Sequence, residues 1–372
     1  MIWNMYSQNM NANNQKRNKK KKRNFIFRGV SILCTIVFLV SGLCGCTAGG
    51  NGEENLPKDQ KKLRVVTTIF PQYDFVRQIA GDNVSLTMLL KPGEETHSYE
   101  PTPQDIIAIQ NADLFIYVGG ENDEWVEDIL ESPEMEDVKR LRLVDCVGNI
   151  LAEEHVEGMK EERGHSHEDE EEESHDEEEH FLHSAEETEE EHNEHVHTMD
   201  EHVWTSPGNA IDIVEHITEE LCSLDPEHGQ TYKDNAEAYE TQLKELDTAF
   251  RDVVENAKNH TLLFGDRFPF RYFAAEYGLD YYAAFSGCAS DTEPSAATMA
   301  FLINKVKEEH IPVVLKMELS NDNIANAIAE ACDVPVRVFY SSHNISAKQF
   351  EAGVTYLDLM KENVETLKEA LR

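Results

Sequence analysis

Ten histidines lie between His155 and His202, among long runs of glutamate and aspartate. Imidazole is the commonest protein ligand for zinc and similar transition metals, and clustered carboxylates raise the local concentration of any divalent cation. Many of these histidines are two or three residues apart, so a flexible chain could fold several of them around one ion. The candidate auxiliary ligands are His165, His167, His175, His180, His183, His192, His195 and His197. A charge run alone is more typical of a disordered, solvated loop, and the histidines favour a metal-collecting loop over 152–199.

The same stretch explains most of the charge of the chain. The stretch between Leu151 and Val203 has twenty-three acidic residues and two basic ones, Lys160 and Arg163. It therefore carries about −21 of the formal net charge of −39. Nucleic-acid binding depends on neutralising phosphates with Lys and Arg. The composition therefore disfavours a nucleic-acid partner and favours cations.

Two histidines outside the densest part of the run stand where a folded domain could use them. His97 lies in a Gly- and Pro-rich loop directly before a predicted helix, and His202 lies just before Trp204, where another predicted helix begins. In open α/β folds, ligands bind at the carboxyl ends of strands, in the cleft between lobes. Taken alone, each histidine is more typical of a surface or hydrogen-bonded residue than of a metal ligand.

The first fifty residues predict export. A basic segment ending at Arg23 precedes an uncharged apolar run from Gly29 to Leu43, which has the length of a signal peptide and is short for a membrane span. The run ends in Leu-Cys-Gly-Cys, which resembles the lipobox of bacterial lipoproteins and makes Cys46 the expected lipidation site. We expect a lipoprotein signal peptide over 1–45, a flexible tether over 46–61, and a protein lipid-anchored to the outer face of a bacterial membrane. An uncleaved signal anchor is the alternative.

Four cysteines remain in the body of the chain: Cys146, Cys222, Cys288 and Cys332. Their spacing fits no zinc-ribbon or CxxC pattern, so a thiolate metal site is not expected. A disulfide is possible outside the membrane, and the pair Cys288 and Cys332 is the first candidate, with the other pairings open.

From Lys62 onward the periodicity indicates strands alternating with helices. Strands are predicted over 63–69, 84–90, 114–118 and 141–144 and again over 260–264, 280–285, 313–317 and 336–340, with helices over 71–80, 101–111, 268–277, 295–309, 321–332 and 349–371. Nearly all-apolar strands in such an order predict parallel sheets covered on both faces. An almost uninterrupted helical pattern from Pro226 to Ala257, with Asp225 as N-cap, separates the two groups. We predict an N-terminal α/β lobe over 62–224, a linking helix over 225–257 and a C-terminal α/β lobe over 258–372.

Several motifs together resemble the zinc and manganese solute-binding proteins of bacterial ABC importers. These are Pro-Gly-x-x-x-His-x-Tyr-Glu-Pro-Thr-Pro from Pro92, Asp-x-His-Val-Trp-x-Ser-Pro from Asp200 after a His/acidic insertion, the Gly-Gly-Glu turn at 119–121 and Arg-Tyr-Phe at 271–273. The resemblance covers the whole mature chain. It implies two Rossmann-like lobes joined by one long rigid helix, with a metal site in the interlobe cleft.

The resemblance also implies a ligand set, position by position. His97 and His202 match the first two family histidines. The third family ligand falls near Asp266 and Arg267, where Asp266 could donate an oxygen and Arg267 could not bind a cation. His343 is the likeliest donor at the fourth position, with Glu318 in reserve. Three imidazoles and one carboxylate suit a closed tetrahedral Zn²⁺ site, and Mn²⁺ or iron is the alternative.

The function implied is that of an extracytoplasmic zinc-binding component that delivers the ion to an ABC permease and its ATPase subunit. Two rivals stay open at this stage. A secreted zinc enzyme is disfavoured because the chain has no His-Glu-x-x-His, Gly-x-Ser-x-Gly or P-loop motif, so we expect no enzymatic activity. A role in cell adhesion could accompany transport and leaves no signal in the sequence.

Overall fold

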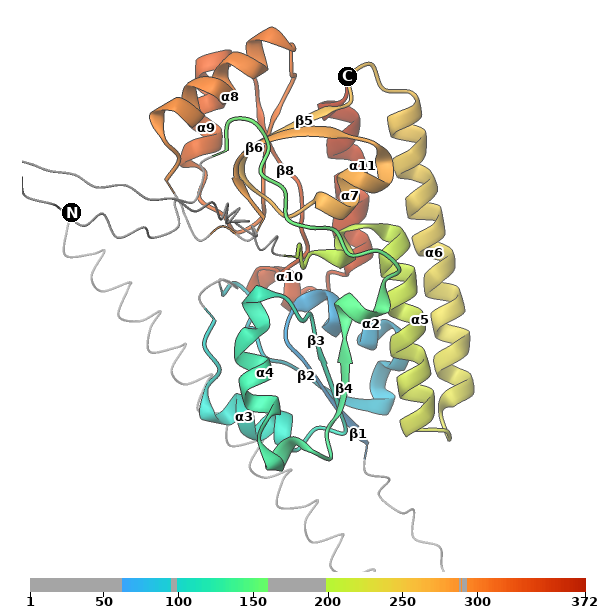
Figure 1. The fold of residues 1–372 in the computed structure, drawn as a ribbon. Coiled ribbons are helices and arrows are strands. Elements are labelled where there is room, and N and C mark those ends of the chain that lie inside the picture. Colours follow the sequence, from blue (N-terminus) through green and yellow to red (C-terminus); the bar gives the residue numbers. More distant parts are fainter. Residues whose placement is uncertain (1–61, 95–98, 160–198, 288, 290–292) are drawn as a thin grey trace, which may run out of the picture. The chain divides into compact units, whose positions relative to one another are not determined.

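Apolar segments that alternate with helices along the chain form the strands of two parallel sheets (Figure 1). The computed structural model describes residues 62–94, 99–159, 199–287, 289 and 293–372. The predicted signal peptide, the tether and most of the His/acidic loop lie outside these residues. Within them, no helix is long and apolar enough to cross a membrane.

The N-terminal lobe is built on a four-stranded sheet in the order β2-β1-β3-β4, with every neighbouring pair parallel. Its strands are β1 (Leu63–Thr67), β2 (Val84–Met88), β3 (Leu114–Tyr117) and β4 (Lys139–Arg142). Its helices are α2 (Phe70–Ala80), α3 (Pro103–Gln110), α4 (Glu124–Leu130) and α5 (Pro207–Leu224).

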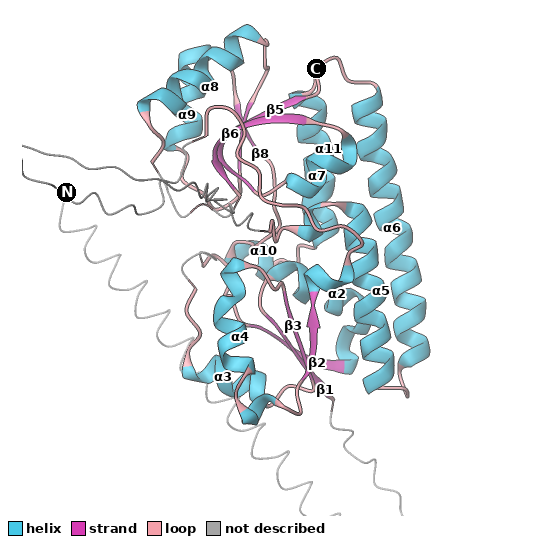
Figure 2. Cartoon of the chain, viewed as in Figure 1, coloured by secondary structure: helices cyan, strands magenta, loops and turns pink. Residues whose placement is uncertain are grey.

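The C-terminal lobe repeats the arrangement with the parallel order β6-β5-β7-β8. Its strands are β5 (Thr261–Phe268), β6 (Asp280–Ser286), β7 (Val314–Lys316) and β8 (Val336–Val338). Its helices are α7 (Arg271–Tyr277), α8 (Ala296–Glu308), α9 (Asn323–Cys332), α10 (Ala347–Glu351) and α11 (Tyr356–Ala370). Figure 2 shows helices packed beside both groups of strands.

The central strands of both sheets are buried on both faces, as their apolar residues predict. Successive strand residues point to opposite faces. Val65 of β1 packs in the core that contains α2 and α5, whereas Val66 packs in the core that contains α3 and α4. In the second sheet, Leu262 joins the core of α7 and α11, and Leu263 joins the core of α8 and α9. The expected fold class of two α/β lobes is therefore confirmed.

One long helix, α6 (Gly229–Glu255), runs beside both lobes (Figure 1). Its buried residues, among them Tyr232, Tyr239 and Phe250, recur at helical spacing and belong to the largest core. The predicted start of this helix was three residues early. The N-cap residue is His228 and not Asp225. The carboxylate of Asp225 instead accepts hydrogen bonds from the Tyr232 hydroxyl at 2.7 Å and from Nδ1 of His228 at 2.8 Å.

The predicted C-terminal helix over 349–371 is two helices in the structure, α10 and α11. Gly353 has a φ of +74°, which breaks the helical path, and the hydroxyl of Thr355 accepts a hydrogen bond from the backbone N–H of Asp358 at 3.0 Å. The turn between the helices therefore combines a residue that tolerates left-handed backbone with a new N-cap.

The disulfide predicted between Cys288 and Cys332 is absent from the structure. Cys332, at the end of α9, is a free thiol, and its Sγ donates to the carbonyl of Ile303 in α8 at 3.5 Å. The thiol thus packs against the neighbouring helix. Cys146 and Cys222 are also free, and Cys288 lies outside the described residues.

Candidate metal centre between the lobes

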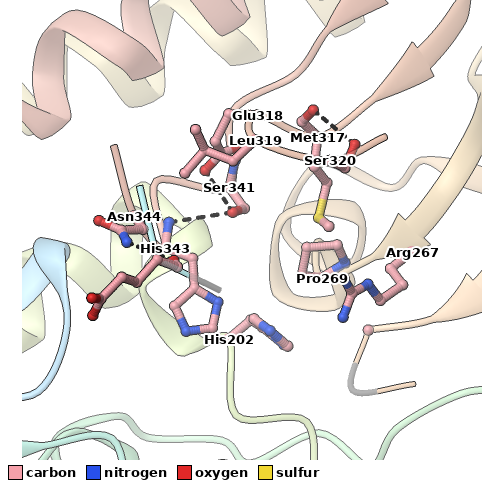
Figure 3. A pocket seen from close by; sticks show the side chains of 12 residues that line it. His202, Arg267, Pro269, Met317, Glu318, Leu319, Ser320, Ser341, His343 and Asn344 are labelled. Atoms are coloured by element: carbon pink, nitrogen blue, oxygen red, sulfur yellow. Dashed lines mark hydrogen bonds between the residues drawn. The ribbon is translucent and has the colours of Figure 1, made fainter. Parts of the chain in front are cut away.

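A small cavity of about 40 Å³ lies where the two lobes meet (Figure 3). Segments that follow the ends of β2, β5, β6, β7 and β8 reach it together with the segment that precedes α5. Its lining residues are Glu94, His202, Arg267, Pro269, Gly287, Met317, Glu318, Leu319, Ser320, Ser341, His343 and Asn344. The cavity can hold an ion and is far too small for an organic substrate, since pockets for such molecules enclose about 300 Å³ or more.

His202 is fully buried and has one ring nitrogen without a partner. Its Nδ1 lies 3.1 Å from Oδ1 of Asp200, which also accepts the backbone N–H of His202 at 2.8 Å. Within the described part of the chain, Nε2 has no hydrogen-bond partner. A proton held on Nδ1 by the carboxylate leaves the lone pair on Nε2, which is the arrangement of a metal-binding histidine. An orphaned buried nitrogen otherwise costs about 1–3 kcal/mol.

The electrostatic surroundings of His202 favour positive charge. Burial alone would lower the pKa of the imidazole, but the carboxylates of Asp200, Glu201 and Glu153 outweigh burial and raise the pKa above its ordinary value. The same carboxylates would attract a divalent cation. These carboxylates stabilise positive charge on His202, whether it is carried by a proton or by a metal ion. A cation bound at Nε2 would therefore take the place of the proton.

His343 lies beside His202 in the cavity (Figure 3). The ring centroids of the two histidines are 5.5 Å apart, and the Trp204 ring lies 5.0 Å from that of His343. The backbone N–H of His343 donates to Oγ of Ser341 at 3.2 Å. The structure thus brings together two of the four predicted ligands, His202 and His343, although they are separated by 141 positions in the chain.

Asp266 does not line the cavity in this structure. Its Oδ2 accepts hydrogen bonds from the backbone N–H of Met317 at 3.0 Å and from the Ser320 hydroxyl, and its Oδ1 accepts from the N–H of Arg267 at 2.9 Å. The carboxylate therefore holds the segment after β7, and Arg267 is the side chain that β5 contributes to the lining.

Glu318 is half-buried and, unlike Asp266, lines the cavity. Its Oε2 accepts the backbone N–H of Ser341 at 2.8 Å, and its Oε1 accepts the Ser341 hydroxyl at 2.8 Å. Burial raises the pKa of Glu318 to about 7, against the opposing effect of these hydrogen bonds. This side chain was only a reserve candidate in the sequence, because its distance from the histidines depends on how β7 and β8 pair.

The remaining predicted site residues lie outside the described part of the chain. They are His97, Cys46 and the eight auxiliary histidines from His165 to His197. Among the described residues, no three His, Cys, Asp or Glu side chains are arranged to hold a metal ion. The two imidazoles of His202 and His343 are thus half of the predicted set, and imidazole nitrogen is a donor that suits zinc.

The residues that flank the His/acidic loop, 151–152 and 199–200, are held by hydrogen bonds, and 199–200 lie close to His202 in the chain. Ala152 and Met199 form an antiparallel bridge, one on each side of the loop. The hydroxyl of Tyr272 in α7 accepts the backbone N–H of Leu151 at 3.2 Å and donates to the carbonyl of Asp200 at 2.8 Å. Both ends of the loop therefore start close to the cavity, against the C-terminal lobe.

Sequence reasoning missed two polar residues that organise the centre. Asp200 orients His202, and Asn344 bonds to the loop after β2. The Asp-x-His spacing was a usable signal for the first, since a carboxylate two residues before a histidine can reach its ring. No signal in the sequence points to the second, which depends on the contact between lobes.

Nearly the whole chain after the predicted tether matches known proteins. Residues 65–370 match the family model described as "Zinc-uptake complex component A periplasmic". The chain is 32% identical over 309 residues to the zinc-binding lipoprotein AdcA of Streptococcus pneumoniae strain R6, covering 83% of this chain and 56% of that relative. It is 31% identical over 341 residues to the high-affinity zinc uptake system protein ZnuA of Bacillus subtilis, covering 90% and 94%. The chain thus spans about half the length of the AdcA relatives it matches.

Solved structures show the same fold. The crystal structure of the Zn(II)-bound ZnuA-like domain of S. pneumoniae AdcA superposes with a TM-score of 0.63 at 29% identity, covering 83% of this chain and 99% of that one. The metal-dependent lipoprotein YcdH of B. subtilis superposes with a TM-score of 0.65 at 28% identity, covering 83% and 99%. From the two-lobed fold, the paired histidines and these matches, we conclude that the chain belongs to the ZnuA family of zinc-uptake binding proteins.

Proposed function

We propose that this protein is the extracytoplasmic zinc-binding component of an ABC importer, which captures Zn²⁺ and delivers it to a membrane permease served by an ATPase subunit. The observation that carries the proposal is the fully buried His202, whose unpartnered Nε2 lies beside His343 in an ion-sized cavity between the lobes. The names of the AdcA and ZnuA relatives agree with this cargo. Imidazole donors favour Zn²⁺ over Mn²⁺, which prefers more oxygen ligands.

The proposed ligands are His97, His202 and His343 with one carboxylate. Asp266 remains our proposal from the family pattern, but it would have to release Met317 and Ser320 to reach the ion. Glu318 already lines the cavity. A shell filled by protein leaves no coordinated water to activate, so we propose binding without catalysis.

The His/acidic loop and the lipid anchor complete the proposal. The eight histidines from His165 to His197 would bind ions weakly and raise their concentration next to the cavity, since the loop begins at the Ala152–Met199 bridge close to His202. Lipidation of Cys46 would hold the protein at the outer face of the membrane, next to its permease.

Competition of the purified protein with a zinc chelator tests the proposal. We expect one tight Zn²⁺ site that survives deletion of 160–198, and several weak sites that this deletion removes. Absence of a tight site in the intact protein would overturn the proposed cargo. Tight binding of Mn²⁺ in preference to Zn²⁺ would instead assign the protein to the manganese branch.

The two candidate carboxylates are distinguished by paired variants. If Asp266 is a ligand, Asp266→Asn weakens Zn²⁺ binding by about 100-fold and Glu318→Gln does not, since one ligand of four contributes about 3 kcal/mol. The opposite result assigns Glu318. Both substitutions keep the size and one acceptor oxygen of the side chain, so the comparison separates the loss of charge from the loss of packing.

A further inference from the structure

A single buried side chain joins the cavity-lining segments of the two lobes. Asn344 is only 3% exposed and follows His343 in the segment after β8. Its Nδ2 donates to the carbonyls of Lys91 and Glu94, each at 2.9 Å. Those carbonyls belong to the loop after β2, in the other lobe. The amide therefore spans the interface with two hydrogen bonds from one NH₂ group.

The loop that Asn344 holds is a tight turn at the cavity. The backbone N–H of Glu94 donates to the carbonyl of Lys91 at 3.0 Å, and Gly93 between them has a φ of +89°. Glu94 lines the cavity and lies three positions before the proposed ligand His97. The carbonyls that Asn344 binds are thus at the start and the end of this turn, so the bonds fix the orientation of the whole turn.

Asn344 is itself held firmly. Its Oδ1 accepts the backbone N–H of Ile345 at 2.8 Å, and Ile345 packs with Phe70 of α2 in a small core between the lobes. The N–H of Phe70 also donates to the carbonyl of His343 at 3.4 Å. The segment that carries His343 is therefore anchored to the N-terminal lobe by contacts of its own.

We propose that Asn344 is a positioning residue that couples the loop after β2 to the His343 segment, and so sets how tightly and for how long the cavity holds its ion. The inference rests on the proposed function. Asn344 need not touch the ion, because its two donors act on backbone carbonyls. Loss of these donors would free the turn at Lys91 to Glu94 from the opposite lobe and let the ligands of the two lobes separate, so the ion would leave faster.

The sharpest test is Asn344→Asp in the full-length protein. The new side chain has the same shape and keeps an acceptor for the N–H of Ile345, but it loses both donors. It also adds negative charge to the cavity wall, which by electrostatics alone would strengthen the binding of a cation. Weaker binding therefore cannot come from the direct interaction of the new charge with the ion. Asn344→Ala removes the donors without adding charge.

The matched control is Asn235→Asp. The Nδ2 of Asn235 in α6 donates to the carbonyl of Ile79 at the end of α2, at 2.9 Å, so the substitution removes a similar bond far from the cavity. Folding of each variant is checked by circular dichroism. The readouts are Zn²⁺ affinity by chelator competition, the Zn²⁺ dissociation rate, and the visible spectrum of the Co²⁺-loaded protein, which reports the geometry of the ligands.

We expect both Asn344 variants to bind Zn²⁺ about 10- to 100-fold more weakly, the range for residues that orient metal ligands, mainly through faster dissociation and with an altered Co²⁺ spectrum. Asn235→Asp should leave all three readouts unchanged. Affinity and dissociation within twofold of wild type in both variants, or tighter binding in Asn344→Asp, would overturn the positioning role while leaving the proposed function intact. Absence of a tight Zn²⁺ site in the wild-type protein would overturn both.

Discussion

Replacing His202 with asparagine isolates the contribution of one ring nitrogen. The asparagine amide can still donate to Asp200, as Nδ1 does now, whereas nothing replaces Nε2 in the cavity. The change therefore removes one ligand and preserves the contact that orients the segment before α5. We expect the metal-free protein to remain folded and to lose most of its stabilisation by Zn²⁺.

The size of the effect follows from the number of ligands. Four-ligand zinc sites contribute about 10–16 kcal/mol, so one ligand is worth about 3 kcal/mol, or about 100-fold in affinity. At free Zn²⁺ about 1,000 times the wild-type Kd, the ion stabilises the protein by about 4.1 kcal/mol, and the variant retains about 1.4 kcal/mol. For the unit Lys61–Arg372, with an unfolding entropy of about 2.1 cal/mol/K per residue, the rise in Tm falls from about 6 °C to about 2 °C.

Thermal unfolding in chelator-buffered Zn²⁺ measures this difference without loading the weak sites of the His/acidic loop. His216→Asn on the exposed face of α5 is the matched control, because its Nδ1 lies 2.8 Å from the carbonyl of Asp212 in its own helix. A full 6 °C shift retained by His202→Asn would refute the assignment of Nε2 as a ligand. An equal loss in His216→Asn would show that the shift does not report the interlobe cavity.

Three further changes test the surroundings of the site. Burial raises the pKa of Asp123 to about 7, so the folded state holds a proton that the unfolded state releases near pH 4, and stability falls as pH rises from about 4 to about 7. Asp123→Asn should remove this dependence of the unfolding free energy on pH. In urea unfolding at pH 8 the variant should be more stable than wild type by up to about 4 kcal/mol. The same pH dependence in both proteins would contradict this. Gly287→Ala should weaken Zn²⁺ binding in chelator competition, because its Cβ would lie 3.3 Å from Cε1 of His202 and 3.1 Å from a backbone oxygen, and unchanged affinity would show that the wall yields. Trp204→Phe should lower the free energy of unfolding by about 1–3 kcal/mol, because it removes the indole N–H that donates to the carbonyl of the buried Ser341 at 2.9 Å, and a smaller loss would mean that water replaces the indole.

Much of the fold could be predicted because it depends on local patterns. The apolar strands separated by helical periodicity predict two parallel sheets, and both are present with every neighbouring pair parallel. The errors concern helix ends, where a single residue decides whether the helix begins, continues or stops. Asp225 bonds to Tyr232 instead of capping α6, and Gly353 divides the last helical segment into two helices.

The site was predictable in part. His202 and His343 could be chosen from motifs, and the structure places their rings 5.5 Å apart. Asp266 and Arg267 could not be ranked by position alone, because adjacent residues of a strand point in opposite directions, and a register shift in β5 lies between Phe264 and Arg267. Only the folded chain shows that Arg267 lines the cavity.

The sequence by itself determined the class of the protein: residue types and their local spacing specify helices, strands, the His/acidic loop and the imidazole donors. The tertiary structure alone decided which polar groups meet. Glu318 accepts hydrogen bonds from Ser341, and Asn344 donates to the turn at Lys91. His202 lines the cavity, and its Nε2 has no partner among the described residues. These contacts join segments that are distant in sequence, and their geometry depends on the packing of two lobes against α6, which no local pattern encodes.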